Sequence, residues 1–295
     1  MQWMADHEAD AIRADYVLTE SGGLHTGPPE QPHISVAVGE KGVAWRRLRV
    51  RGTPGHGSTP FKADNALMTA AAVIQRIGDY RPPPRFHELW TTTVDRLGVD
   101  DETKRNLLDE SRIDDYLESL PRPGLGAFLH ACTHTTFSSN TIGGGGPSRM
   151  KTNVIPDCVD IGVDVRTLPG ERHDDVTAHL RAALGDLYDK VDVEVIMDDP
   201  ASISRLDNPL WDCLERALAK PFPAARPTPQ LEVGFSDARI YREMGAVAYG
   251  AGLFSPDVDP AEFGRRFHGN DERVDVESLR LTTQLWLDVV HDLLG

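Results

Sequence analysis

The sequence contains no long apolar run, few cysteines and no excess of basic residues. No stretch approaches the roughly 18 apolar residues of a membrane span. Residues 1–8 have neither a basic region nor an apolar core, so we expect no signal peptide there. The three cysteines form no Cys-x-x-Cys pair, which favours reduced thiols over a disulfide framework. These absences predict a cytoplasmic protein without a membrane partner.

Acidic residues dominate the charge. There are 46 Asp and Glu against 31 Lys and Arg, which gives a net charge of -15 and a pI of about 5.1. Because nucleic acids and anionic membrane surfaces attract basic stripes, we expect neither as a partner. A hydrophobic content of 40% with 26% charged residues is typical of a globular protein, and 295 residues are enough for two domains.

One histidine lies in a loop rich in glycine and proline. His56 is flanked by Gly55 and Gly57, between an alternating segment at 43–50 that predicts a strand and an apolar-periodic segment at 64–77 that predicts a helix. Glycine allows backbone conformations that other residues avoid, and proline fixes φ. A loop built from both can therefore hold one imidazole in place. An exposed histidine in a polar turn explains the same residues.

A carboxylate follows an apolar segment near the start of the chain. Residues 14–19 predict a buried strand that ends at Glu20, before the turn residues Ser21, Gly22 and Gly23. The carboxyl ends of strands in α/β sheets commonly hold ligands or metals. A solvated glutamate at a turn is the alternative.

The middle of the chain predicts a second layer of structure. Residues 159–166 alternate as a half-exposed strand, and a helix and a strand at 192–196 follow. Together with 43–77 this predicts a compact α+β layer. Residues 79–130 begin with a proline-rich break and continue as polar helical segments, which we interpret as solvated decoration and not a site. The four glycines at 143–146 lack the residues of a phosphate-binding loop and predict a hairpin.

Six short segments occur in the order found in one family of zinc enzymes. They are 16–23 (YVLTESGG), 52–58 (GTPGHGS), 152–156 (TNVIP), 164–166 (DVR), 234–239 (GFSDAR) and 267–272 (FHGNDE). Across nearly the whole chain except 79–130, the sequence resembles the zinc metallohydrolases that include aminoacylase, carboxypeptidase G, carnosine dipeptidase and succinyl-diaminopimelate desuccinylase.

The resemblance implies a fold and a division into domains. It implies an α/β fold, in which a phosphorylase/hydrolase-like zinc-peptidase catalytic domain carries an inserted α+β lid that also serves for dimerisation. Residues 1–41 and 200–295 would belong to the catalytic domain, and residues 42–199 to the lid. The protein would form a homodimer through the lid.

The resemblance also implies roles for individual residues. Glu20 is similar to a carboxylate ligand of one zinc ion and His268 to a histidine ligand of the other. His56 resembles a lid histidine that reaches the partner subunit's active site and stabilises an oxyanion. Zn²⁺ accepts nitrogen and oxygen ligands and lowers the pKa of its bound water to about 7.

A second set of residues would bind a small substrate through its carboxylate. Asn153, Arg166 and Arg239 are similar to the residues that grip this group, and Gly250 and Gly252 would offer backbone N–H groups nearby. Arginine suits this role because its planar fork matches a carboxylate. Arg166 paired with Asp164, and Asn153 capping a turn, are the alternatives.

Some motifs of the family are missing. No His-x-Asp motif precedes Glu20 and no Glu-Glu pair occurs anywhere in the sequence. We therefore expect a catalytic domain whose upstream part is absent, either because the start is internal to a longer reading frame or because the gene is truncated. Such a chain would not assemble the dinuclear centre or hydrolyse amides alone. The alternative is a non-catalytic dimerising or carboxylate-binding protein.

Overall fold

The computed structural model describes residues 1–121, 123–144, 151–259, 263, 266 and 270–295. They form two compact units. The first unit comprises Met1–Lys41, Pro84–Thr133 and Ser202–Gly295, and the second comprises Gly42–Pro83 and His134–Ala201. The chain passes from the first unit to the second after residue 41, returns to the first unit for residues 84–133, and returns again after residue 201.

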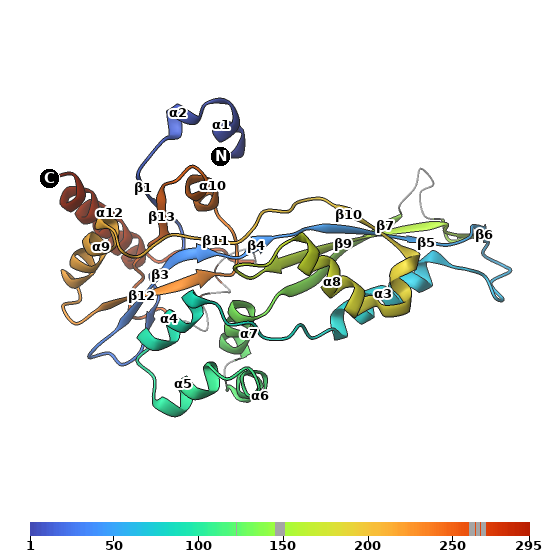
Figure 1. Cartoon of the computed structure of the whole chain (residues 1–295), viewed down its shortest axis with the longest axis horizontal. Helices are drawn as coiled ribbons and strands as arrows, with labels where there is room; N and C mark the ends of the chain where they lie inside the picture. Colours follow the sequence, from blue (N-terminus) through green and yellow to red (C-terminus); the bar gives the residue numbers. More distant parts are fainter. Residues whose placement is uncertain (122, 145–150, 260–262, 264–265, 267–269) are drawn as a thin grey trace. The chain divides into compact units, whose positions relative to one another are not determined.

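The sheet of the first unit is built around β3 (His33–Glu40). β3 pairs in parallel with β12 (Arg226–Glu232) and antiparallel with β2 (His25–Thr26) and β11 (Ser202–Ile203). It also meets the last residue of β13 (Val247–Gly250), which runs parallel to β1 (Tyr16–Thr19). Residues 34–40 are all buried, so β3, which is labelled beside β12 in Figure 1, reads as a nearly continuous apolar run. β1 is half-buried and not fully buried as its sequence predicts.

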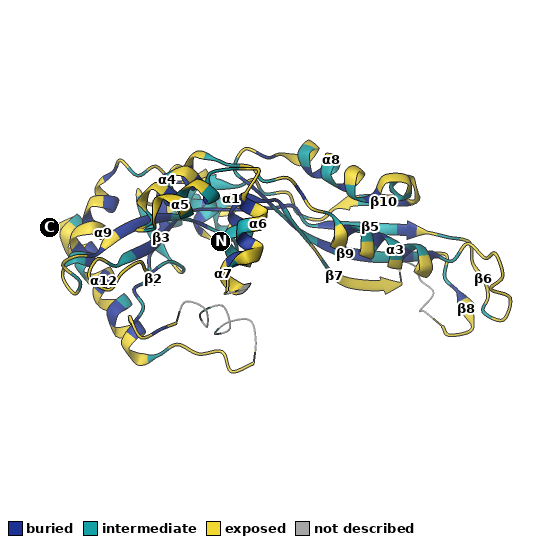
Figure 2. Ribbon diagram, turned by 90° about the horizontal axis from the view of Figure 1, so that it is seen from below, coloured by how far each residue is buried: buried dark blue, intermediate teal, exposed yellow. Residues whose placement is uncertain are grey.

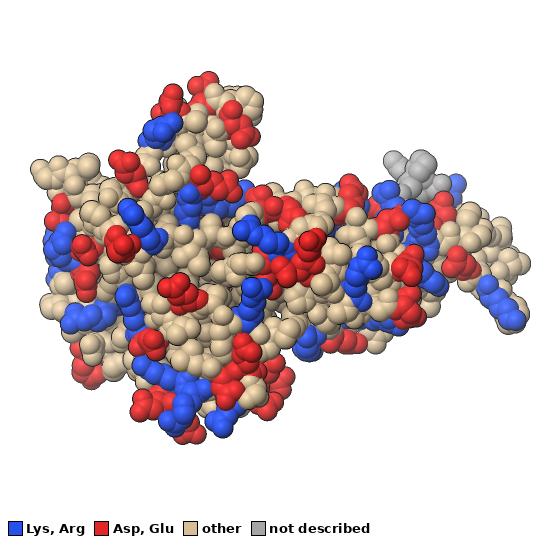
Figure 3. Space-filling view, viewed as in Figure 1, with Lys and Arg blue, Asp and Glu red and all other residues tan. Residues whose placement is uncertain are grey.

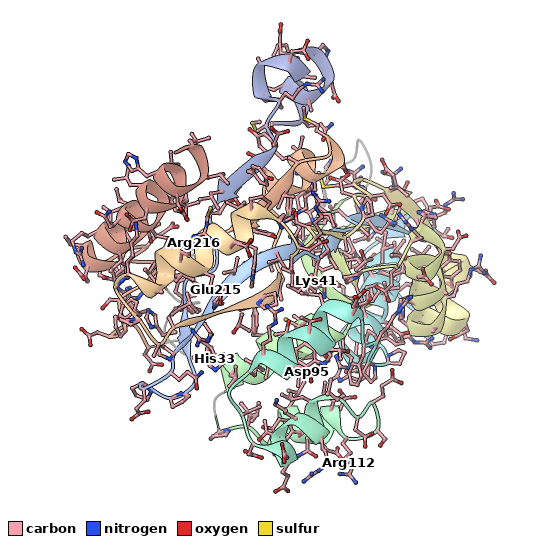
Figure 4. All side chains as sticks on the ribbon, turned by 60° about the vertical axis from the view of Figure 1, so that its left-hand side comes forward. His33, Lys41, Asp95, Arg112, Glu215 and Arg216 are labelled. Carbon is pink, nitrogen blue, oxygen red and sulfur yellow. The ribbon has the colours of Figure 1, made fainter. Side chains whose placement is uncertain are left out.

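Five helices of the first unit lie near the two ends of the chain. They are α1 (Gln2–His7), α2 (Ala9–Ile12), α9 (Pro209–Ala219), α10 (Ala238–Glu243) and α12 (Val276–Leu294). α12 is capped by Asp275, whose side chain accepts a hydrogen bond from the Ser278 amide. α9 and α12 are joined by an ion pair of 2.8 Å between Arg216, visible in Figure 4, and Asp292.

Residues 84–133 form four helices and not the solvated decoration predicted from the sequence. They are α4 (Glu88–Arg96), α5 (Asp101–Leu107), α6 (Ile113–Ser119) and α7 (Pro123–Thr133). Trp90, Val94, Ile113 and Leu117 are buried together in one apolar cluster. Within α4 and α6 the buried residues recur four positions apart, but the polar residues between them dominate the sequence pattern. α4, which carries Asp95, packs on β12 (Figure 4).

The second unit is an antiparallel sheet covered on one face by two helices. Its strands are β4 (Gly42–Val43), β5 (Arg46–Arg51), β7 (Thr136–Gly144), β9 (Cys158–Thr167) and β10 (Val191–Val195). The helices are α3 (Ala66–Asp79) and α8 (His173–Leu184), and a 3-10 helix, η1, spans Gly185–Lys190. β9 alternates strictly between buried and half-buried residues, as predicted. Figure 2 shows this banding on β5 and β9.

The core of the second unit lies between the sheet and the two helices. Val159, Ile161, Val163 and Val165 project from β9 into a cluster with apolar residues of α3 and α8. α3 begins at Ala66, two residues after the start of the predicted segment, because the side chain of Asn65 accepts a hydrogen bond from the Leu67 amide and caps the helix. A separate two-stranded ribbon joins β6 (Gly55–His56) to β8 (Val154–Ile155).

No helix among the residues described is both long and apolar enough to span a membrane. On the face drawn in Figure 3, acidic and basic side chains alternate and no extended basic patch is visible.

Candidate functional site

Glu20 stands at the end of β1 before a turn with an uncommon backbone. Ser21, Gly22 and Gly23 have φ values of 80°, 70° and 85°. Positive φ is costly for serine, and such strained positions cluster at functional sites. The Gly23 amide donates to the carbonyl of Ser35 at 2.7 Å, which fixes the turn against β3. The turn therefore holds the exposed Glu20 in a defined place at the sheet end.

Three glutamates of the first unit line one small hollow. Its wall includes Glu20, Glu40 and Glu232, each of which is the last residue of its strand or the first after it. Gly250 and Arg242 contribute to the same wall. Carboxylates at strand ends are suited to bind a cation or to position a polar substrate. Sequence reasoning found only Glu20, although Glu40 ends an apolar segment in the same way.

Glu40 is the most deeply buried of these carboxylates. Arg242 Nη1 donates to Glu40 Oε1 at 2.8 Å, and the Ser236 amide donates to Oε2 at 2.5 Å. The two charged side chains are only 2% and 6% exposed. Burial raises the pKa of Glu40 above its ordinary value, although the positive charge of Arg242 offsets part of this effect. The pair ties α10 to β3 and makes one wall of the hollow rigid.

Gly250 allows β13 to approach the turn after β1. A Cβ on Gly250 would lie 2.3 Å from the Glu20 carbonyl oxygen, a distance that real Cβ atoms do not reach. The Gly252 amide donates to the Ser21 carbonyl at 2.8 Å. The Gly252 amide therefore stabilises the Glu20 turn, whereas the sequence predicted that it would be available to a substrate carboxylate.

Arg239 lies on α10 beside the hollow. Its guanidinium is 5.0 Å from the centre of the Phe235 ring, and Nη1 donates to the Ser236 carbonyl at 3.3 Å. Its charge also contributes to the electrostatics of Glu40. The first unit therefore holds Glu20, Arg239, Gly250 and Gly252 of the predicted site residues.

His56 and Asn153 lie together in the second unit, on the ribbon of β6 and β8. The Gly57 amide donates to the Asn153 carbonyl at 2.8 Å. His56 Nδ1 accepts from the Ser58 amide at 3.2 Å, so in the neutral ring the proton is on Nε2. His56 is exposed. It is therefore a preset hydrogen-bond donor at the surface of this unit.

Arg166 lies on β9 of the second unit and is already paired. Its Nε and Nη2 donate to the two oxygens of Asp164 at 2.7 and 3.2 Å. Asp164 Oδ1 also accepts from the Trp45 indole at 2.8 Å. This is the pairing that the sequence analysis held as an alternative to substrate binding.

The last predicted ligand, His268, lies outside the described residues. Glu20 and Glu232 offer oxygen ligands of a kind that Zn²⁺ accepts. However, no three ligand atoms that include Glu20 lie within 4.8 Å of one another in the described parts of the chain. These residues therefore fit a zinc ion in donor type but fall short in number.

One His-x-Asp motif does occur far downstream of Glu20, at His173-Asp174-Asp175. The Asp175 carboxylate accepts from the Arg172 amide at 2.8 Å, and His173 Nδ1 lies 2.9 Å from Asp198 Oδ2. The motif therefore begins helix α8 and supplies its N-terminal cap. The His-x-Asp motif alone therefore does not identify a metal site.

The described residues thus form one unit whose sheet has acidic strand ends and a second unit in which two helices cover a sheet. The model of the peptidase dimerisation domain (M20_dimer) matches residues 38–192, more than half of the sequence. The chain therefore belongs to the M20 peptidase family. This bears out the resemblance stated from the six segments, and with it the mixed α/β fold.

Individual relatives match over most of this chain. It is 23% identical to a probable carboxypeptidase S-like protein of Dictyostelium discoideum and 24% identical to an N-fatty-acyl-amino acid synthase/hydrolase of Danio rerio, over 89% and 90% of its length. The crystal structure of human carnosine dipeptidase 1 has a similar fold, with a TM-score of 0.64 and 16% identity over 99% of this chain and 61% of that one. The chain spans about half the length of the curated relatives, 49% and 51%.

Proposed function

We propose that this chain serves a zinc-dependent hydrolase of amide bonds that lie next to a free carboxylate, with an N-acyl amino acid or a small peptide as the substrate. The observation that carries the proposal is the hollow in which a strained turn presents Glu20 beside Glu40 and Glu232. The names of two relatives, an N-fatty-acyl-amino acid hydrolase and a dipeptidase, support it because both substrate classes contain an amide and a carboxylate.

Glu20 would be one metal ligand and His268 another. When bound, zinc would polarise the amide carbonyl and activate water. Among the chain's own groups, the Glu40–Arg242 pair would keep the wall of the hollow in place. Gly250 would allow the close approach that sets the position of Glu20, and the Gly252 amide would hold the turn through the Ser21 carbonyl.

Arg239 is the best candidate to grip the substrate's carboxylate. Its contact with Phe235 orients the guanidinium plane, and a planar fork binds a carboxylate through two hydrogen bonds. Asn153 and Arg166 would act in the second unit. Because Arg166 is held by Asp164, binding substrate would require an exchange of partners, and we assign it the weaker contribution.

His56 would donate its Nε2 hydrogen to the oxyanion that forms at the amide carbonyl. The bond from the Ser58 amide to Nδ1 sets this tautomer. We propose that the acceptor lies in the site of a second copy of the chain, in a homodimer formed through the second unit. The match to a peptidase dimerisation domain supports this assembly.

The test is hydrolysis of an N-acetyl amino acid, and of the same compound with its carboxylate amidated, by a zinc-loaded full-length version that also carries the His-x-Asp and Glu-Glu motifs. We expect this version to turn over the free acid only, and we expect no turnover of either compound by the present chain alone. His56→Ala should lower kcat by about 10²–10³, as the loss of an oxyanion donor does, with zinc content by mass spectrometry unchanged. His291→Ala, at another exposed histidine, is the control.

Loss of zinc in His56→Ala would make His56 a ligand and contradict its proposed role. If neither compound is hydrolysed while the protein sediments as a dimer and binds free carboxylates, the non-catalytic alternative is correct.

A further inference from the structure

The helix α12 is apolar on two opposite faces. Its inner face, which includes Leu281, Leu285 and Val289, is buried in the first unit beside α9 (Figure 1). On the opposite face six large apolar side chains are 37% to 83% exposed, and we call them the outer stripe. They are Val276, Leu279, Trp286, Leu287, Val290 and Leu294. Helices that are apolar all round are normally covered all round, so the outer stripe indicates a docking surface.

The outer stripe has the size of a small interface. α12 contains 19 residues and is therefore about 28 Å long at a rise of about 1.5 Å per residue. Its exposed apolar side chains present on the order of 500 Å², which is as large as the largest patch on a typical monomer. A standard interface buries about 800 Å² on each partner. With the polar residues along its rim, the stripe thus suits a specific contact of low affinity.

A seven-residue repeat runs along this side of the helix. In the heptad notation abcdefg, Val276, Thr283 and Val290 occupy a, and Leu279, Trp286 and Leu293 occupy d. β-branched residues at a with leucine at d favour two helices packed in parallel. In such a pair each a and d residue lies next to its counterpart on the other helix. A second copy of α12 therefore supplies the complementary surface.

The charges beside the stripe match the same parallel arrangement. Residues at g and e of two paired helices meet across the seam, and here they are Asp275 at g and Arg280 at e. Arg280 donates to Glu277 through Nε and Nη2 at 2.8 and 2.6 Å, which leaves Nη1 without a hydrogen bond among the described residues. An antiparallel pair would set e against e and g against g, and no opposite charges would meet. The charges therefore favour the parallel pair.

The largest side chain of the stripe is already fixed in place. Trp286 Nε1 donates to the Ala251 carbonyl at 2.6 Å. The helix itself is tied to α9 by an ion pair of 2.8 Å between Lys220 and Asp288. Because the surface is ordered before a partner arrives, docking costs little conformational entropy.

We propose that the outer stripe of α12 binds the same stripe of a second copy of the chain, as a parallel two-fold pair of helices. The stripe contains no charged residue, so an apolar partner suits it and an ionic ligand does not. This contact is separate from the homodimer proposed through the second unit, and it does not depend on the proposed reaction. It should add a weak association step, with a Kd on the order of 10 μM.

Cysteine cross-linking tests both the partner and the orientation. In the parallel pair Thr283 faces Thr283 of the second copy, whereas Gln284 lies off the stripe. Thr283→Cys should form an intermolecular disulfide under mild oxidation, because a disulfide requires Cα atoms within about 7 Å of one another. Gln284→Cys is the matched control and should not form it. The natural Cys132 and Cys213 are buried, and the parent protein gives the background from the half-buried Cys158.

A charge on the stripe should prevent the association. Val290 is 48% exposed, and Val290→Glu places two carboxylates against each other in the pair. We expect the Kd from sedimentation equilibrium to rise by at least about 100-fold. His291→Glu adds the same carboxylate one residue along the helix but off the stripe, and should change the Kd by less than about fivefold. Thermal unfolding of both variants should stay close to that of the parent, because both positions are exposed.

Several outcomes would overturn the helix pair. One is equal cross-linking of Thr283→Cys and Gln284→Cys, and another is unchanged association of Val290→Glu. Binding to phosphatidylcholine vesicles that Val290→Glu abolishes, without self-association, would make a lipid surface the occupant. Loss of the Thr283→Cys cross-link in a longer version of the protein would show that the stripe is covered within one chain.

Cross-linking of Thr283→Cys alone, together with association that only Val290→Glu weakens, would support the helix pair. This result would hold whether or not any form of the protein hydrolyses an amide, so the pair and the proposed function stand or fall separately.

Discussion

The two units bury their apolar residues in different ways. In the second unit, valine, isoleucine and leucine side chains of one sheet face and two helices fill a common core. In the first unit, the cluster of α4–α7 surrounds a cavity of about 230 Å³, and the neighbouring strand ends carry acidic residues. The comparison indicates that the second unit is built for rigidity and the first for binding, since binding requires space and polar groups that a filled core excludes.

The two units also differ in how deeply they bury their ion pairs. In the first unit, Glu40 and Arg242 form an ion pair with both side chains almost fully buried. On the open face of the second unit's sheet, Arg47 and Glu194 pair at 2.8 Å while 43% and 52% exposed. Breaking the buried pair should therefore lower the free energy of unfolding strongly, whereas breaking the exposed pair should change it little because water screens those charges.

The largest expected effect is therefore at Arg242. Arg242→Ala leaves the carboxylate of Glu40 buried without a partner, and we expect the free energy of unfolding to fall by about 3–5 kcal/mol. Arg47→Ala, the matched change at the exposed pair, should cost about 0–1 kcal/mol. Urea unfolding of both variants at neutral pH measures the difference, and similar costs would contradict the contrast between the units.

The next effect compares two leucines on helices. Leu180 on α8 is 1% exposed in the core of the second unit, and Leu180→Ala should cost about 2–5 kcal/mol. Leu129 on α7 already faces the cavity, so Leu129→Ala removes fewer contacts and should cost about 1–2 kcal/mol. The midpoints of chemical unfolding measure both. Equal losses would show that the cavity wall is as well packed as the core.

The second unit is the part of the fold that the sequence predicts best. In an antiparallel sheet with one solvated face, buried and more exposed residues alternate along each strand. β9 shows this alternation from Val159 to Arg166. In the first unit, the core strand β3 is buried on both faces and carries no such period. The cluster of Trp90, Leu107 and Ile113 comes from three short helices, and only tertiary contacts reveal it.

The candidate site shows a similar limit. A strand followed by a carboxylate predicts Glu20, and its placement in a turn follows from Ser21 and the glycines after it. Arg242 could not be found this way, because its partner Glu40 lies 202 residues away and its role depends on the burial of both side chains. The residues next to Arg242 in the sequence carry no information on that contact.

Two glycines sharpen the comparison within the candidate site. Gly250→Ala would place a Cβ 2.3 Å from the Glu20 carbonyl oxygen, so we expect β13 and the Glu20 turn to shift at a cost of about 1–3 kcal/mol. A Cβ at Gly55, next to His56, would lie 3.5 Å from Ile155, which is an ordinary contact. Gly55→Ala should therefore be nearly neutral. Thermal unfolding and zinc affinity should both change in the first variant alone, and an unchanged Gly250→Ala would mean that the turn tolerates displacement.

The smallest effect concerns pH, and it separates the units by sign. Burial alone would raise the pKa of Glu171 in the second unit, but hydrogen bonds from His179, Thr135 and the Leu168 amide outweigh it and hold this pKa below its ordinary value. Ionised Glu171 therefore stabilises the folded protein above the unfolded pKa of about 4.3, and this contribution disappears as the pH falls through the lower folded pKa. For Glu40, whose pKa is raised, the contribution is instead lost as the pH increases.

Glu171→Gln should accordingly lower stability at pH 7 and flatten the loss of unfolding free energy on acidification below about pH 4.3. Urea midpoints measured across this range give the slope. The exposed Glu118→Gln is the control and should keep the slope of the parent protein. If Glu171→Gln keeps that slope as well, the hydrogen bonds do not outweigh burial at Glu171, and the carboxylates of the two units would respond to pH with the same sign.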